Sequence, residues 1–188
     1  MYQIRIHGRG GQGGKTASKI LGTAAFIDGK YVQDFPKYGA ERRGAPVFAF
    51  TRIDNKPVEA RGYIYEPDAI IVLDESLLEM PLVGVLDGLK KDGVLIVNSR
   101  SSAGEIKNKY KIKAKVIAVP ATDIAIQTLG KPIPSAVITG AFVKSTGVIS
   151  MGSLKKAIRE ELSERGTISE DIIKKNIQGA VKCAGEVK

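Results

Sequence analysis

A glycine-rich segment near the start of the chain constrains its fold more than any other feature. Before it, residues 2–7 alternate between apolar and polar side chains, as a strand with one buried face does. Residues 8–14 then hold five glycines in seven positions, and apolar side chains from Ala17 to Ile27 repeat at helical spacing. A strand, a tight bend and a helix are therefore predicted in succession. Such a bend turns backbone N–H groups and the positive end of the helix dipole toward whatever lies beyond the strand.

Three later segments, 69–73, 94–97 and 116–119, are apolar on both faces. Runs of this kind are typical of parallel strands that helices cover on both sides. Helix-like segments alternate with them along the chain. We therefore predict a three-layer α/β/α architecture with a mostly parallel, mixed central sheet and C-terminal helices.

Antiparallel strands are predicted in the first third of the chain. Residues 31–35 have the composition of a second strand. Residues 47–53 and 58–63 flank Asp54-Asn55-Lys56-Pro57, which has the composition of a turn, so these two segments are predicted to pair as a hairpin. This hairpin is the reason for predicting a mixed sheet.

Helices are predicted between and after the later strands. Residues 75–90 have a helical pattern that Pro81 and Gly84 interrupt. Three further helices are predicted over residues 104–110, 123–129 and 135–146. Two helices separated by Gly166 fill 150–188, and Thr167 with Glu170 fits a capping box for the second. The length of 188 residues suits a single domain spanning 1–188.

Composition narrows the class of function. The net charge is +9, but the Lys and Arg residues are scattered and often have acidic neighbours, so a nucleic-acid partner is not predicted. No apolar run is long enough to span a membrane, and no signal-peptide pattern precedes the first strand, so we expect a cytoplasmic protein. One cysteine, Cys183, and one histidine, His7, are too few for an iron–sulfur or His-rich zinc site. We expect Cys183 to be a half-buried structural thiol and His7 a hydrogen-bonded structural residue.

The glycine segment is compatible with more than one function. A P-loop would need glycine at position 9, which is Arg9, although Lys15-Thr16 follows Gly14 as that motif requires. Gly8, Gly10 and Gly13 fit the G-x-G-x-x-G pattern of NAD- and FAD-binding proteins, with Asp28 or Asp34 as the ribose-binding acid. Against this, Asp28 belongs to a helix-ending turn, and a loop and hairpin follow Asp34. A third possibility is close packing against another subunit, with Arg9 and Gln12 bonding across the interface.

A second unusual segment, residues 38–46, reads Tyr-Gly-Ala-Glu-Arg-Arg-Gly-Ala-Pro. Arg42 and Arg43 carry planar guanidinium groups suited to carboxylate or phosphate. Polar residues also follow the predicted parallel strands: Asp74, Asn98, Ser99, Thr122 and Asp123. They should gather at the carboxyl edge of the sheet beside Gly8–Gly13, where ligands bind in such folds and where these residue types also cap helices.

Together the two segments carry a resemblance. Gly-Arg-Gly-Gly-Gln-Gly at the end of the first strand, followed by Tyr-Gly-x-Glu-Arg-Arg-Gly-Ala-Pro, resembles the gamma subunit of 2-oxoacid:ferredoxin oxidoreductases, the pyruvate type above all. The resemblance extends through 67–75, 94–98, 121–125 and 138–141 to the C-terminal helices.

The resemblance implies a multi-subunit enzyme that converts a 2-oxoacid and coenzyme A to acyl-CoA, carbon dioxide and reduced ferredoxin. It implies alpha, beta and delta partner subunits that hold thiamine diphosphate, Mg and iron–sulfur clusters, and an isolated gamma chain that is inactive and holds no cofactor alone. It also suggests docking or coenzyme-A-facing groups, with no catalytic residue among them. These are Gly8, Arg9, Gly10, Gly11, Gln12, Gly13, Lys15, Thr16, Arg42 and Arg43. A free-standing NAD- or FAD-binding protein that uses Gly8, Gly10 and Gly13 is the alternative.

Overall fold

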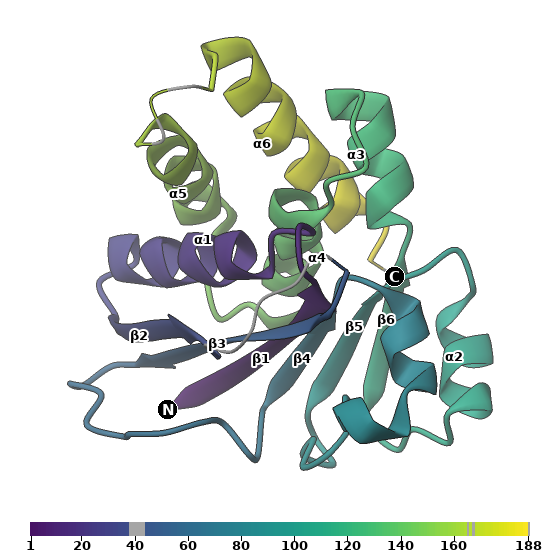
Figure 1. Ribbon diagram of the computed structural model, residues 1–188. Helices are drawn as coiled ribbons and strands as arrows, with labels where there is room; N and C mark the ends of the chain where they lie inside the picture. Colours follow the sequence, from purple (N-terminus) through teal and green to yellow (C-terminus); the bar gives the residue numbers. More distant parts are fainter. Residues whose placement is uncertain (38–43, 165, 167, 188) are drawn as a thin grey trace.

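A computed structural model describes residues 1–37, 44–164, 166 and 168–187 (Figure 1). Its centre is a six-stranded sheet in the order β2-β3-β1-β4-β5-β6. The strands are β1 (Tyr2–Arg9), β2 (Tyr31–Pro36), β3 (Pro46–Asp54), β4 (Ala69–Val72), β5 (Val94–Asn98) and β6 (Lys115–Val119). β1, β4, β5 and β6 are parallel neighbours, whereas β3 pairs antiparallel with both β1 and β2. The predicted mixed, mostly parallel sheet is confirmed.

Helices cover the sheet in layers (Figure 1). The α-helices of the described chain are α1 (Gly14–Ile27), α2 (Ala103–Lys109), α3 (Ala121–Leu129), α4 (Ser135–Thr146), α5 (Met151–Ser163) and α6 (Glu170–Gly185). α1 and α4 lie on one face, and α3, α5 and α6 form a further layer above them. On the opposite face, α2 packs beside β6, together with the short 3₁₀ helices η1 (Glu75–Glu79) and η2 (Pro81–Val83). Helices thus lie on both faces of the sheet, which confirms the predicted three-layer α/β/α architecture, and α3, α5 and α6 thicken the helical layer on the α1 side.

Two apolar cores correspond to the two faces of the parallel part of the sheet. Alternate residues of β4 enter different cores: Ile71 packs toward α1 and α4, while Ile70 and Val72 pack toward α2 and η1. This is why the strand is apolar at every position. In the larger core, α4 and α6 cross at Gly140, where a Cβ would come within 1.8 Å of the Ala180 carbonyl oxygen. Glycine at this position therefore lets the two helices pack closely.

The predicted hairpin is wrong. Residues 47–53 do form most of β3, but 58–63 form no strand and β3 does not pair with them. The physical reason is that β1 and β2 already occupy both hydrogen-bonding edges of β3. Residues 55–68 instead cross below the sheet to β4, and Arg52 Nη2 donates to the Gly62 carbonyl oxygen at 2.8 Å.

The interruption predicted within residues 75–90 is confirmed: the helical pattern gives two short 3₁₀ helices, Pro81 begins the second, and Gly84, with a positive φ of 59°, ends it. One further expectation differs from the structure. The cap of α6 is Ser169, which accepts from the Ile172 N–H, so the predicted capping box at Glu170 is wrong. Thr167 lies outside the described residues. No helix within the described ranges is long and apolar enough to cross a membrane.

Candidate functional site

The two unusual segments meet at the carboxyl edge of the sheet. Gly10 N–H donates to the Ala45 carbonyl oxygen at 2.9 Å, and Gly44 N–H donates to the Gly10 carbonyl oxygen at 3.2 Å. The glycine bend between β1 and α1 is therefore bonded directly to the chain that leads into β3. Arg42 and Arg43 lie outside the described residues, but Gly44 and Ala45 place the end of their segment beside the bend.

Arg9 ties this edge together from within the chain. Its Nε donates to Asp74 Oδ2 at 2.9 Å, its Nη1 to the Gly44 carbonyl oxygen at 3.1 Å and its Nη2 to Ser76 Oγ at 2.8 Å. One guanidinium thus holds both bends and the start of η1. Its planar fork makes such a three-way contact possible.

Gln12 completes the same network. Its Oε1 accepts from the Arg9 N–H at 2.8 Å, and its Nε2 donates to Asp74 Oδ2 at 3.0 Å. Burial would raise the pKa of Asp74, but hydrogen bonds from Ser76 and Gln12, with the Arg9 charge nearby, hold that pKa below its ordinary value. Asp74 is therefore an ionised anchor at neutral pH. The side chains of Arg9 and Gln12 therefore form hydrogen bonds within the chain, and only the backbone of the bend is left to contact another molecule.

The glycines serve backbone shape and close packing. Gly11 and Gly13 adopt φ angles of 96° and 83°, which favour glycine. At Gly13 a Cβ would also lie 2.6 Å from Ser135 Oγ, at the start of α4. Gly13 is the N-cap of α1 and makes no side-chain cap bond. The bend thus places the N-terminus of α1 at the molecular edge.

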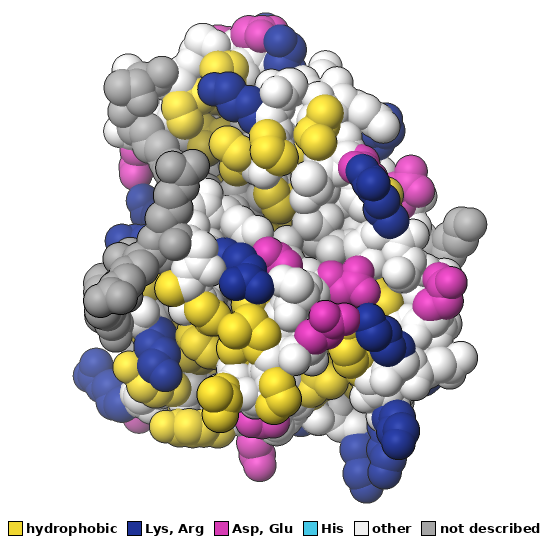
Figure 2. Space-filling view, turned by 45° about the vertical axis from the view of Figure 1, so that its right-hand side comes forward, with side chains coloured by type: hydrophobic (Ala, Val, Ile, Leu, Met, Phe, Trp, Pro, Cys, Tyr) yellow, Lys and Arg dark blue, Asp and Glu magenta, His cyan; other side chains and the backbone are white. Residues whose placement is uncertain are grey.

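A cavity of about 380 Å³ lies beside the bend. Gly11, Gly13 and Thr16 form one wall, and the connection between α3 and α4 contributes Lys131 and Ile133. Apolar side chains from the ends of α5 and α6 form the far wall. Figure 2 shows this face hollowed between the outer helical layer and the strand ends. Lys131 was not predicted, because Gly-Lys-Pro-Ile-Pro has the composition of an ordinary turn between helices.

The polar strand ends gather at the same edge, as predicted. Asn98 Oδ1 accepts from the Thr122 N–H at 2.9 Å and so caps the start of α3. Ser99 Oγ donates to Glu75 Oε2 at 2.5 Å, and Arg100 donates twice to Asp123 at 2.7 Å. Helix capping, given above as the other role for such residues, accounts for Asp74 and Asn98, since Asp74 caps η1.

His7 and Cys183 are structural residues. His7 is fully buried, and its Nε2 accepts from Arg5 Nε at 3.0 Å. Burial, and then the Arg5 charge, lowers the pKa of His7 to about 3, which removes it from acid–base work near neutral pH. Cys183 is fully rather than half buried, and burial raises its pKa to about 12. No group of three or more His, Cys, Asp or Glu side chains in the described ranges is placed to hold a metal ion.

The geometry gives no support to the dinucleotide alternative. Asp34 lies on β2, and β3 separates that strand from β1, whereas a ribose-binding acid belongs on the strand next to the glycine bend. Asp28 is engaged elsewhere: its carboxylate accepts from the Ser150 N–H at 2.6 Å and from Ser153 Oγ at 2.6 Å, at the start of α5.

Comparison with known proteins decides the family. The family model described as pyruvate ferredoxin/flavodoxin oxidoreductase matches residues 3–184. The chain belongs to this family. The resemblance found in the two glycine-bearing segments is therefore confirmed, and membership of this family gives no support to a free-standing dinucleotide-binding protein.

Relatives within the pyruvate ferredoxin/flavodoxin oxidoreductase family match along most of their length. The pyruvate/ketoisovalerate oxidoreductases common subunit gamma of Pyrococcus abyssi is 55% identical over 164 residues, 87% of this chain and 88% of that protein. Pyruvate synthase subunit PorC of Methanocaldococcus jannaschii is 51% identical over 158 residues, 84% of each chain. Among solved structures, pyruvate oxidoreductase subunit PORC of Thermotoga maritima superposes with a TM-score of 0.83 at 39% identity, covering 100% of this chain and 97% of that one.

Proposed function

We propose that this chain is the gamma subunit of a pyruvate or related 2-oxoacid:ferredoxin oxidoreductase, and that it is inactive alone. The observation that carries the proposal is the 55% identity to a protein named as a common gamma subunit, over 87% of this chain. Alpha, beta and delta subunits are the proposed partners, with ferredoxin as the electron acceptor of a cytoplasmic complex.

Within the complex, the proposed role of this chain is to complete the region where coenzyme A approaches the carbon atom derived from the 2-oxoacid. Thiamine diphosphate, Mg and iron–sulfur clusters are proposed to lie on the partner subunits, where they supply decarboxylation and electron transfer. The bend at Gly8–Gly13 and the segment with Arg42 and Arg43 then face coenzyme A or the partner chains. Arg9 and Gln12 act by holding the bend in shape.

The surroundings of the bend support a role in seating coenzyme A. The N-terminus of α1 favours a negative group, and Lys15 in its first turn is exposed. Lys131, on the connection between α3 and α4, contributes a cation to the lining of the cavity. Cations suit the phosphates of coenzyme A, and the apolar lining from Leu129, Ile133 and Leu162 suits its uncharged arm.

The test is kinetic and uses the assembled enzyme. The double variant R42A/R43A and the single variant Lys15→Ala are each combined with the partner subunits, and the KM for coenzyme A is measured at saturating 2-oxoacid. Loss of one charged contact to a phosphate should raise this KM about ten- to a hundredfold, since such contacts contribute roughly 1.5–3 kcal/mol. The KM for the 2-oxoacid should stay unchanged.

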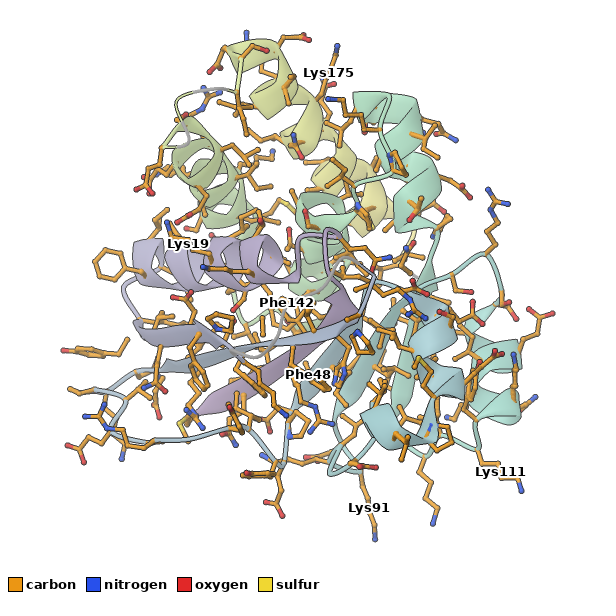
Figure 3. The ribbon with its side chains drawn as sticks, viewed as in Figure 1. Lys19, Phe48, Lys91, Lys111, Phe142 and Lys175 are labelled. Atoms are coloured by element: carbon orange, nitrogen blue, oxygen red, sulfur yellow. The ribbon has the colours of Figure 1, made fainter. Side chains whose placement is uncertain are left out.

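Lys91→Ala is the matched control. Lys91 is exposed and points away from the molecule at the opposite edge of the sheet (Figure 3). An unchanged KM for coenzyme A in R42A/R43A, with normal assembly, would refute the coenzyme role and leave both bends as docking elements. An enzyme that assembles and turns over fully without this chain would refute the subunit assignment itself.

A further inference from the structure

An apolar groove of about 570 Å³ opens on the face of the sheet opposite α1, below β1 and β3. Strand β3 contributes Phe48, the crossing segment contributes Tyr63 and Tyr65, and the region around η2 contributes Met80 and Leu82. In Figure 3 Phe48 lies on this side of the sheet, whereas Phe142 lies on the side that the helices cover. The groove exists because the chain between β4 and β5 forms only short 3₁₀ helices, which leave this end of the sheet without an α-helix.

Side chains along the groove are far more exposed than an internal packing role requires. Leu82 is 103% exposed and Tyr65 is 74% exposed, and Tyr63 and Met80 are also exposed. Figure 2 shows hydrophobic side chains gathered below the hollow, on the lower part of the face that it presents. Contiguous exposed apolar surface of this kind marks a site of protein association more often than an accident of composition.

The groove is also positively charged. Arg5, only 6% exposed, lies at its floor and donates to the carbonyl oxygens of Ile64 and Val85. Lys37 stands at its rim, with Nζ 5.2 Å from the centre of the Phe48 ring and 5.3 Å from that of Tyr63. Neither cation makes an ion pair with a carboxylate in the part of the chain that the structure describes. Asp87 lines the groove, accepts a hydrogen bond from Arg5 Nη2 at its backbone carbonyl oxygen (2.5 Å) and acts on Arg5 through the charge of its carboxylate.

The groove adjoins the glycine bend. Arg9 Nη2, which donates to Ser76 Oγ, also contacts Met80 Sδ at 3.7 Å. Met80 in turn lines the groove. A partner seated in the groove would therefore lie next to the guanidinium that holds both bends together.

We propose that this groove receives an apolar segment of a partner subunit of the oxidoreductase, and that this segment carries a carboxylate that pairs with Lys37. The inference rests on the proposed function, because it takes the occupant from the same complex. Charge complementarity selects the chemistry: Lys37, which has no carboxylate partner in the described chain, favours an acidic group, and the aromatic and aliphatic walls favour apolar side chains around it. Arg5 is already satisfied by His7 and by backbone carbonyl oxygens, so Lys37 at the rim is the cation that makes a basic segment a poorer occupant.

The experiment measures binding of the full chain to the remaining subunits, which are purified together without it. The double variant L82S/Y65S removes the two most exposed apolar side chains of the groove, and Lys37→Glu reverses the charge at the rim. Each should raise the dissociation constant at least tenfold, measured by biolayer interferometry. Lys37→Arg should retain wild-type binding. Circular dichroism melts of each free chain establish that the variants are folded.

Phe26→Ser is the matched control. Phe26 is 71% exposed near the end of α1, on the other side of the sheet, so its exposure resembles that of Tyr65. Equal binding by the wild type, L82S/Y65S and Phe26→Ser would overturn the groove proposal and leave the subunit assignment intact. Failure of the wild-type chain itself to bind would overturn both. A free chain that dimerises, and that L82S/Y65S turns into a monomer without weakening subunit binding, would assign the groove to a second copy and overturn the proposal.

Discussion

The two faces of the sheet at β1 and β3 differ sharply although the same strands build both. On the face toward α1 and α4, Ile4 and Ile6 are fully buried in an aliphatic core. On the other face, the alternate residues of the same strand are Arg5 and His7, and the neighbouring strand places aromatic rings beside them. One face therefore has the buried aliphatic side chains of a protein interior. The other has the mixture of aromatic, cationic and exposed apolar side chains that is typical of an interface.

This difference between the two faces suggests that the covered face determines the stability of the fold and that the open face serves assembly with a partner. The helix-covered face gains its stability from apolar burial and close packing, which need no partner. The open face satisfies its buried cation with backbone carbonyl oxygens and keeps apolar side chains in contact with water. A chain that functions only within a complex can retain such a face, because the partner buries it. The following predictions test how far this separation holds.

The largest effect is expected in the covered core. Phe142 is fully buried on α4 and meets the Tyr2 ring edge-on at 6.2 Å. Phe142→Ala should lower the free energy of unfolding by about 3–5 kcal/mol, the usual cost of an aromatic deletion in a packed core. Phe48→Ala, on the open face, should cost only about 1 kcal/mol, because its ring is half-buried and leaves a space that water can fill. Urea denaturation of the free chain measures both, and equal losses would contradict the comparison.

A smaller effect concerns His7, which lies on the face of β1 opposite α1 and packs against the Phe48 ring. Its folded pKa of about 3 lies below the ordinary value, so the unfolded chain binds a proton that the folded chain does not. The stabilising effect is fully present above about pH 6.5 and is lost as the pH falls toward 3. Between pH 6 and pH 4 the free energy of unfolding should fall by about 2–3 kcal/mol from this group.

His7→Gln is the variant that isolates this effect. It should remove the His7 contribution and so flatten the decline between pH 6 and pH 4, relative to the wild type. Because His7 is the sole histidine of the chain, its ring signals in an NMR titration report the pKa without overlap. Titration near 6.5 in the folded chain would show that the ring is hydrated and that the face below β1 is open to water at that point.

Much of the fold could be predicted from the sequence because its signals are local. The alternation in residues 2–7, the glycines after it and the three apolar runs each identify an element from its own residues. The gathering of the polar strand ends beside Gly8–Gly13 was also predicted, since parallel strands bring their carboxyl ends to one edge. The hydrogen bonds from Arg9 and Gln12 of the bend to the Asp74 carboxylate confirm it.

The rest depends on contacts between residues that are distant in sequence. The choice of β2 rather than 58–63 as the partner of β3 is set by which edges of the sheet are free, and no local pattern records this. Lys131 joins the cavity only because α4 begins at Ser135, directly against Gly13. The groove could not be predicted from the sequence either. Tyr65, Met80 and Leu82 lie in different loops and short helices, and no local pattern indicates that they line one groove.

The smallest effect is expected where the apolar side chains are most exposed, and it gives the sharpest test of the comparison. In the free chain, L82S/Y65S should change the free energy of unfolding by no more than about 0.5 kcal/mol, because substitutions of exposed side chains remove little burial. The measurement is urea denaturation of the free chain, with the same slope expected for variant and wild type. A loss above about 1 kcal/mol would mean that Leu82 and Tyr65 support the chain's own fold, and any weakened binding would then have an indirect cause. A neutral result beside a tenfold loss of subunit binding would show that this face contributes to assembly and not to folding.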